Sequence, residues 1–155
     1  MKGNEKIIEI LNDFLADELS AINQYMVHSE MCDNWGYGRL HAAIEKRAID
    51  EMKHAEKLIA RILFLEGKPV VSELKPINIG AAVDLQIKND WEAESGAIKA
   101  YNAGIQLCLD LGDSGSRELI EDNLQDEEGH IDWLEAQLDQ IKQMGLSTYL
   151  LGQVE

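Results

Sequence analysis

The chain has 155 residues, a length typical of one domain, and 45% of them are hydrophobic. Its 29 acidic residues outnumber its 14 basic ones, and the net charge of -15 disfavours binding to a nucleic-acid backbone. No apolar run approaches the ~20 residues that cross a bilayer, and the N-terminal residues carry no secretion signal. We therefore expect a cytoplasmic protein that binds neither nucleic acid nor membrane.

Hydrophobic residues recur at helical spacing over most of the chain, and the pattern breaks at glycine-rich segments. In chain order, it predicts four long helices and a short C-terminal one, over Ile7–Asn34, Leu40–Leu65, Ala81–Leu111, Ile120–Ile141 and Ser147–Leu151. Gly67 and Pro69 follow the second helix, and a turn over residues 112–116 offers N-caps for the fourth.

The connections between these helices predict how they are arranged. Lys68–Gly80, between the second and third helices, is the one long connection, and the two outer ones are short. Short links join antiparallel neighbours, whereas a long link can travel the length of a bundle. We therefore expect an all-α fold that forms one domain over residues 1–155. Its topology should be an up-down four-helix bundle with one long crossover and a short fifth helix.

Two of the predicted helices contain the same metal-binding pattern, Asp-Glu-x-x-His. It places Glu51 beside His54 in the second helix and Glu127 beside His130 in the fourth. Residues three apart share a helical face, so each pair can hold one ion. A single Glu-x-x-His is a weak signal, because it also occurs on solvated faces.

A lone glutamate precedes each pattern on a face that should point into the core. Glu18 precedes Glu51 by 33 residues, and Glu94 precedes Glu127 by the same distance. The halves look like duplicated helical hairpins, which predicts a site of approximate twofold symmetry. Four buried carboxylates require cations, and a mixture of carboxylates and imidazoles suits iron or manganese. The predicted ligands and catalytic residues are Glu18, Glu51, His54, Glu94, Glu127 and His130.

Other polar residues lie near these candidate ligands. Asp50 and Asp126, one turn before the two histidines, are expected to orient the imidazoles through their other nitrogens. Tyr25 and Tyr101, seven residues after the lone glutamates, either donate hydrogen bonds to a bridging carboxylate or fill the core. Gly129 costs about 1 kcal/mol of helix propensity, which suggests a close backbone approach or a local bulge.

Several blocks of the sequence resemble bacterioferritin, a ferritin-like family. They are Met1–Gly3, Ala21–Tyr25, Ile49–Ala55, Arg61–Gly67 and Asp126–Glu135. The resemblance implies a ferroxidase centre of two iron ions per subunit, held by the six residues named above. It also implies a hollow homo-oligomeric cage of twenty-four subunits. Such a cage stores and detoxifies iron by oxidising Fe(II) with dioxygen or hydrogen peroxide and mineralising the product.

Met52 is the residue through which the family binds haem b, one methionine coming from each of two subunits. On its helix Met52 lies about 100° around from Glu51 and so points away from the metal core. Without the resemblance, such a methionine in an apolar stripe would be read as interface filler. The resemblance implies that the haem carries electrons for iron release, supplied by a small ferredoxin.

Two departures from the family pattern are visible. Family members often carry histidine and glutamate where this chain has Lys46 and Arg47, and those residues are associated with iron on the inner surface. Leu58 replaces a tyrosine often found near the centre, although Trp133 remains. The inner-surface route for iron is therefore left open here.

Other functions fit the same helical pattern. A di-iron oxygenase or a di-manganese catalase would use a similar bundle and differ in substrate pocket or metal preference. A rubrerythrin would add a rubredoxin-like set of four cysteines, and this chain has two in all. A purely structural cage subunit would lack some of the six ligands.

Overall fold

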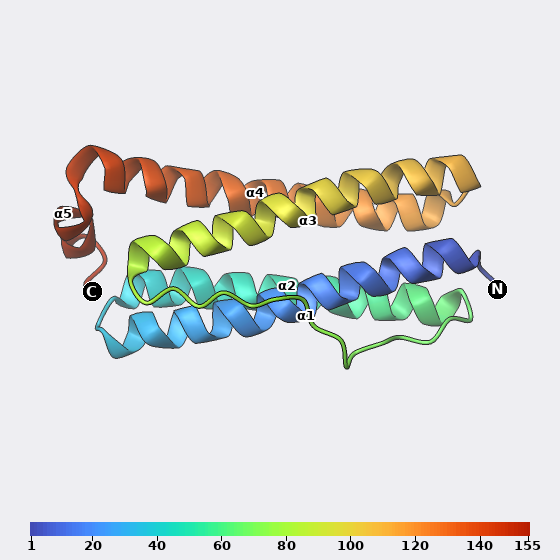
Figure 1. The fold of residues 1–155 in the computed structure, drawn as a ribbon, viewed down its shortest axis with the longest axis horizontal. Helices are drawn as coiled ribbons and strands as arrows, with labels where there is room; N and C mark the ends of the chain where they lie inside the picture. The colour runs from blue at the N-terminus through green and yellow to red at the C-terminus, as the bar shows by residue number, and fades with distance from the viewer.

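The computed structural model describes all residues from Met1 to Glu155 and is entirely helical. Its elements are α1 (Glu5–Asn34), α2 (Gly38–Phe64), α3 (Val83–Leu111), α4 (Ser114–Met144) and α5 (Leu146–Leu151) (Figure 1). The predicted all-α, ferritin-like bundle with a short fifth helix is confirmed. No helix combines the length and hydrophobicity that a membrane span requires.

The start of α4 differs from the sequence prediction. The helix begins at Ser114, inside the segment predicted to be a turn. Asp113 is its N-cap, because its side chain accepts a hydrogen bond from the backbone N–H of Ser116 at 2.9 Å. The hydroxyl of Ser116 also donates to Asp113, and Ser116 itself lies within the first turn of α4.

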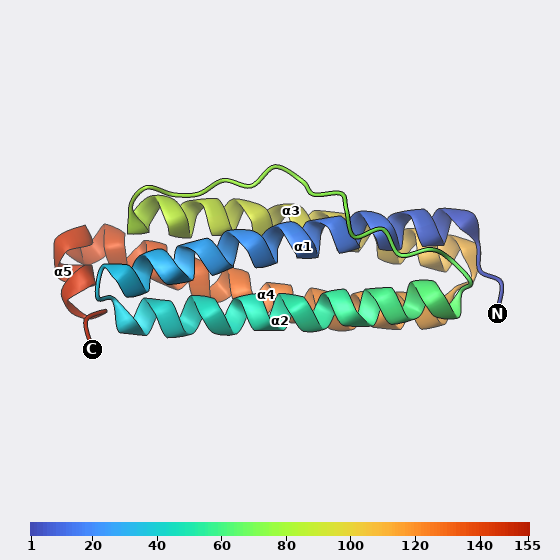
Figure 2. The same ribbon diagram turned by 90° about the horizontal axis from the view of Figure 1, so that it is seen from below.

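The bundle consists of two antiparallel hairpins, α1 with α2 and α3 with α4, which lie side by side (Figures 1 and 2). The long crossover between α2 and α3 runs along the outside of the bundle past α1 and α3 (Figure 2). Four side chains on one face of α1 hold the crossover in place. They accept hydrogen bonds from backbone N–H groups of the crossover at 2.7–3.0 Å. These pairs are Asn12 with Val70, Ser20 with Lys75, Gln24 with Asn78, and His28 with Gly80.

The short helix α5 packs against one end of the bundle (Figure 1). Tyr149 is its buried residue, and its hydroxyl donates a hydrogen bond to Oε1 of Gln137 on α4 at 2.8 Å. Beyond α5, the carbonyl of Gln153 accepts from the N–H of Arg39 at the start of α2, at 3.2 Å.

The apolar core is divided into two clusters. One contains Leu11, Leu58 and Ile120, and the other contains Leu40, Ile87 and Leu134. Between them, each of the four long helices turns a glutamate inward, and all four glutamates are at most 2% exposed. The polar layer in the middle of the bundle is the candidate functional site.

Candidate metal centre

The six predicted ligands meet in the middle of the bundle, and every long helix contributes. Their ligand atoms form two groups, each with all its atoms within 4.8 Å of one another. The groups are Glu18, Glu51, His54 and Glu127, and Glu51, Glu94, Glu127 and His130. Glu51 and Glu127 belong to both groups, so the geometry is that of two adjacent sites with two bridging carboxylates. The role of these residues as metal ligands stays a prediction.

The two groups are related by approximate twofold symmetry. Glu18 of α1 and His54 of α2 complete one group, and Glu94 of α3 and His130 of α4 complete the other. This is the arrangement that the repeated spacing of 33 residues predicts, because each hairpin contributes one lone glutamate and one Glu-x-x-His pair.

Burial changes the protonation of these glutamates in the metal-free protein. It raises the pKa of Glu94 to about 8 and that of Glu51 well above its usual range, because a charged carboxylate is desolvated there. Burial acts in the same direction on Glu127, but hydrogen bonds from Glu94 and the histidines outweigh it and hold that pKa well below its usual range. Without metal, protons on Glu51 and Glu94 therefore reduce the negative charge that bound cations would otherwise neutralise.

Both histidines point one ring nitrogen into the centre. Nδ1 of His54 lies 3.0 Å from Oε1 of Glu127, and Nδ1 of His130 lies 3.2 Å from Oε2 of the same residue. Burial by itself lowers the pKa of each imidazole, but hydrogen bonds with the surrounding glutamates raise both, that of His130 to about 12. A metal ion entering the centre must therefore displace protons from the histidines.

One carboxylate oxygen in the centre makes no well-directed hydrogen bond. Oε1 of Glu51 is buried, and its ion-pair neighbour is Nδ1 of His130 at 3.1 Å. A buried carboxylate oxygen that lacks a well-directed hydrogen bond is unfavourable, and a bound cation would satisfy it. The donor set and this oxygen both fit a metal pair.

The two aspartates of the repeated motif orient the imidazoles. Each aspartate contacts the histidine of the other helix, not the histidine that follows it in its own motif. Nε2 of His54 on α2 lies 2.9 Å from Oδ2 of Asp126 on α4, and Nε2 of His130 on α4 lies 3.4 Å from Oδ2 of Asp50 on α2. The reason is geometric. Each ring directs Nδ1 into the centre, so its other nitrogen faces the neighbouring helix.

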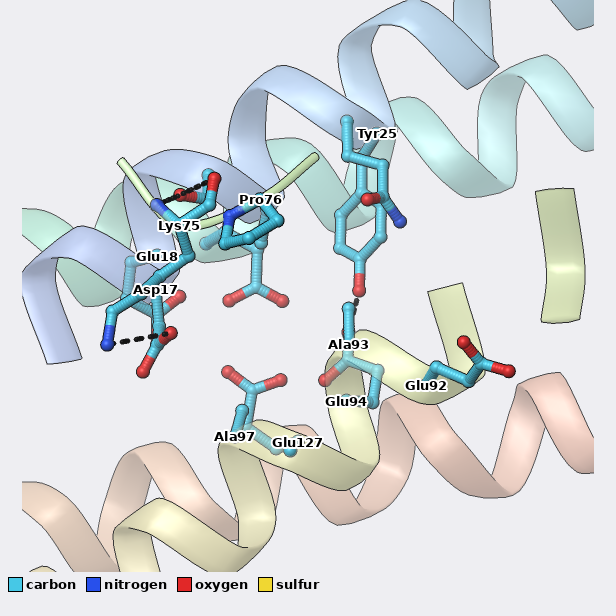
Figure 3. A pocket seen from close by; sticks show the side chains of 15 residues that line it. Asp17, Glu18, Tyr25, Lys75, Pro76, Glu92, Ala93, Glu94, Ala97 and Glu127 are labelled. Atoms are coloured by element: carbon cyan, nitrogen blue, oxygen red, sulfur yellow. Dashed lines mark hydrogen bonds and ion pairs between the residues drawn. The ribbon is translucent and has the colours of Figure 1, made fainter. Parts of the chain in front are cut away.

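The two tyrosines also act across the bundle. Tyr25 on α1 donates a hydrogen bond to Glu94 on α3, and Tyr101 on α3 donates to Glu18 on α1 (Figure 3 draws the first of these). The expected phenol–carboxylate bonds are present, but they reach the lone glutamates rather than the shared ones. Burial raises both phenol pKa values, so both hydroxyls remain donors.

Comparisons with known proteins agree with this geometry. The family model described as a ferritin-like domain matches residues 8–144. A bacterioferritin of Brucella melitensis biotype 1 is 44% identical over 96% of this chain and 92% of its own length. Those of Rhodobacter capsulatus and Streptomyces coelicolor are each 40% identical, over 97% and 100% of this chain and 94% and 93% of their own lengths.

This chain belongs to the bacterioferritin family. Met52, whose role in haem binding stays a prediction, lies on α2 and is 46% exposed. It points away from the metal centre, as expected from its helical position. Ile49 on α2 and Met26 on α1 are also exposed apolar side chains.

In this bacterioferritin-family chain, one pocket leads to the centre between α1 and α3. It has a volume of about 200 Å³, and Glu18, Glu94 and Glu127 line it (Figure 3), together with Glu51. Lys75 of the crossover lies at its rim and approaches Asp17 of α1 at 3.9 Å.

Sequence reasoning missed both residues at this rim. Burial raises the pKa of Asp17 to about 6. The only sequence signal for Asp17 is that it precedes Glu18, and nothing in the sequence brings the crossover lysine to it.

A second pocket, of about 400 Å³, opens on the other side of the bundle between α2 and α4. Arg47 and Trp133 line it, and the guanidinium lies over the indole ring at 4.5 Å. Gly129 also lines it, in an uninterrupted stretch of α4, and a Cβ there would meet nothing within 4 Å. The expectation that Gly129 marks a close backbone approach or a bulge is therefore wrong.

Proposed function

We propose that this protein is a cytoplasmic iron-storage ferroxidase that oxidises Fe(II) to Fe(III) with dioxygen or hydrogen peroxide. The observation that carries the proposal is the pair of overlapping ligand groups sharing Glu51 and Glu127. Two divalent ions would balance the four carboxylates, and mixed oxygen and imidazole ligands suit iron. The bacterioferritin relatives support storage as the purpose of the oxidation.

Each residue of the centre has a role in this proposal. Glu18 with His54, and Glu94 with His130, would each hold one ion, while the two shared glutamates would hold both. Bound iron supplies the redox step, in which ferrous ions become ferric and the oxidant is reduced. The histidines and the protonated glutamates must release protons as the ions bind.

The surroundings of the centre keep its ligands in place. Asp126 and Asp50 hold the outer nitrogens of the two imidazoles, which fixes their orientation toward the ions. Tyr25 and Tyr101 hold the two lone glutamates by hydrogen bonds from neutral phenols. The pocket between α1 and α3 is the proposed access for ferrous iron, because all four glutamates of the centre line it.

The proposal extends to assembly and to haem. We expect twenty-four copies to form a hollow homo-oligomeric cage that mineralises ferric iron. Haem b would lie between two subunits, where Met52 of each would hold it, and a small ferredoxin would donate the electrons for iron release. Met52 is 46% exposed in a single chain, which leaves its thioether free to reach a group bound on the surface.

Rapid mixing with ferrous iron tests the ferroxidase. The wild-type protein should oxidise about two Fe(II) per subunit in a fast phase with dioxygen or hydrogen peroxide. Glu51→Ala and His130→Ala should abolish that phase, whereas Glu56→Ala and Glu128→Ala, at exposed positions of the same helices, should retain it. A fast phase that persists in both centre variants would overturn the assignment. Metal analysis that finds manganese would favour a catalase instead.

A further inference from the structure

The side chain of Arg47 is a buried charge without an ion-pair partner. It is 5% exposed, and its Nε and Nη1 atoms take part in no hydrogen bond. Its one favourable polar contact is with the face of the Trp133 indole, at 4.5 Å. Buried guanidinium groups are normally paired with anions, because removing the charge from water is strongly unfavourable.

The carboxylates that share the pocket with Arg47 are already engaged. Asp50 lies 3.3 Å from Nζ of Lys46 and 3.4 Å from Nε2 of His130. Asp126 lies 2.9 Å from Nε2 of His54. The guanidinium is thus the one charged group of this pocket without an opposite charge beside it, and the missing charge is negative.

Gly129 is an independent sign that the pocket is built to be open. Glycine in the middle of a long helix weakens that helix relative to alanine. No neighbour requires it, because a Cβ at this position would meet nothing within 4 Å. Its missing side chain leaves room in the pocket, opposite Lys46 and Arg47 of α2.

We propose that the pocket between α2 and α4 binds an inorganic oxyanion, hydrogen phosphate, on Arg47 and Lys46. A guanidinium presents several donors in a planar fork that matches phosphate oxygens, and a lysine adds a second positive charge. Asp50 and Asp126 would repel a fully ionised anion but can accept a hydrogen bond from the proton of hydrogen phosphate. Sulfate has no such proton, so the pocket should favour phosphate over sulfate.

This binding is independent of ferroxidase activity and is tested without iron. Inorganic phosphate is titrated calorimetrically into the metal-free oligomer near pH 7. We expect saturable binding of one phosphate per subunit, and sulfate about tenfold weaker or worse, because it leaves the two aspartates facing an unprotonated anion. Fluorescence of Trp133 should change on saturation, since phosphate draws the guanidinium from the indole, and Trp133→Phe should remove that change.

Variants on both helices distinguish this site from general charge attraction. Arg47→Met should weaken phosphate binding about tenfold or more by removing charged hydrogen bonds. Gly129→Leu, which fills the pocket from α4, should weaken it as well and does not depend on how the arginine variant folds. Lys57→Met removes one charge from an exposed position of α2 and should leave the affinity unchanged. Absence of saturable binding, unchanged affinity in the first two variants, or an equal loss in the third would overturn the proposal.

Discussion

Asp126 of α4 lies 2.9 Å from Nε2 of His54 on α2, so the carboxylate that orients this histidine belongs to the other copy of the motif. Asp50 and His130 repeat the relationship in the opposite direction, at 3.4 Å. Each Asp-Glu-x-x-His segment is therefore completed by its counterpart on the facing helix, and neither segment is a finished half-site on its own.

Removing the carboxylate of Asp126 should weaken metal binding. Partners of ligating histidines typically contribute about 10- to 100-fold to metal affinity, because they fix the tautomer and the ring orientation. Asp126→Asn should lower the affinity of the metal-free protein for Co²⁺ by that factor, measured from the absorption of the bound ion. Asp122→Asn, at an exposed position one turn earlier, should leave the titration unchanged. Equal curves for Asp126→Asn and wild type would contradict this role.

The metal-free protein should lose stability as the pH rises from about 5 to about 8. The pKa of Glu94 is raised from 4.5 to about 8 in the folded protein, so over this range the folded state holds a proton that the unfolded chain has lost. The raised pKa of His130 acts in the same direction above about 6.5. The melting temperature should fall with pH, and saturating metal should reverse the trend.

The matched variants for this pH dependence are Glu94→Gln and Glu118→Gln. The first removes one buried titrating carboxyl and should make the fall of the melting temperature with pH shallower, most clearly below about pH 6.5 where His130 does not yet contribute. The second changes an exposed glutamate of α4 and should leave the profile as in the wild type. A melting temperature that rises with pH in the metal-free wild type would show that the buried carboxyls are ionised.

Loss of the phenol at Tyr25 should destabilise the metal-free protein. Its hydroxyl donates to Glu94, and removing the donor leaves a buried carboxyl short of a partner. Tyr25→Phe should cost about 1–3 kcal/mol of unfolding free energy, measured by chemical denaturation. Tyr37→Phe, at the connection between α1 and α2, removes a hydroxyl that forms no hydrogen bond and serves as the control. A cost below that of the control would mean that Tyr25 acts as core filler.

Replacement of Met52 should change haem binding without changing iron oxidation. Met52→Leu keeps the apolar volume and removes the thioether ligand, so the absorption spectrum of bound haem should be lost. Met52→His should retain haem with a different axial-ligand spectrum. Met144→Leu, at the end of α4, tests for a general effect of losing a methionine. An unchanged haem spectrum in Met52→Leu would refute the assignment.

The helices and the convergence of the six candidate ligands were predictable from the sequence for a physical reason. Helical periodicity is local, and the equal spacing of Glu18 to Glu51 and Glu94 to Glu127 fixes which residues lie at the same height in two similar hairpins. The shared position of Glu51 and Glu127 between both groups follows from packing the hairpins together.

Features that depend on contacts between helices were not predictable. The exchange of aspartate partners depends on which way each imidazole ring faces, and the sequence carries no signal for that. The position of Lys75 beside Asp17 depends on the path of the crossover along α1. The stacking of Arg47 on Trp133 joins residues 86 positions apart that share no motif.

The division of the donor set between the hairpins gives the metal a mechanical role. One lone glutamate and one Glu-x-x-His pair come from α1 and α2, and the same set comes from α3 and α4. Any ion held by both shared carboxylates therefore links the two hairpins at the middle of the bundle, where the apolar core is interrupted. A metal pair bound there would cross-link the two hairpins at the polar layer, and its removal would leave them held together only by the apolar clusters on either side.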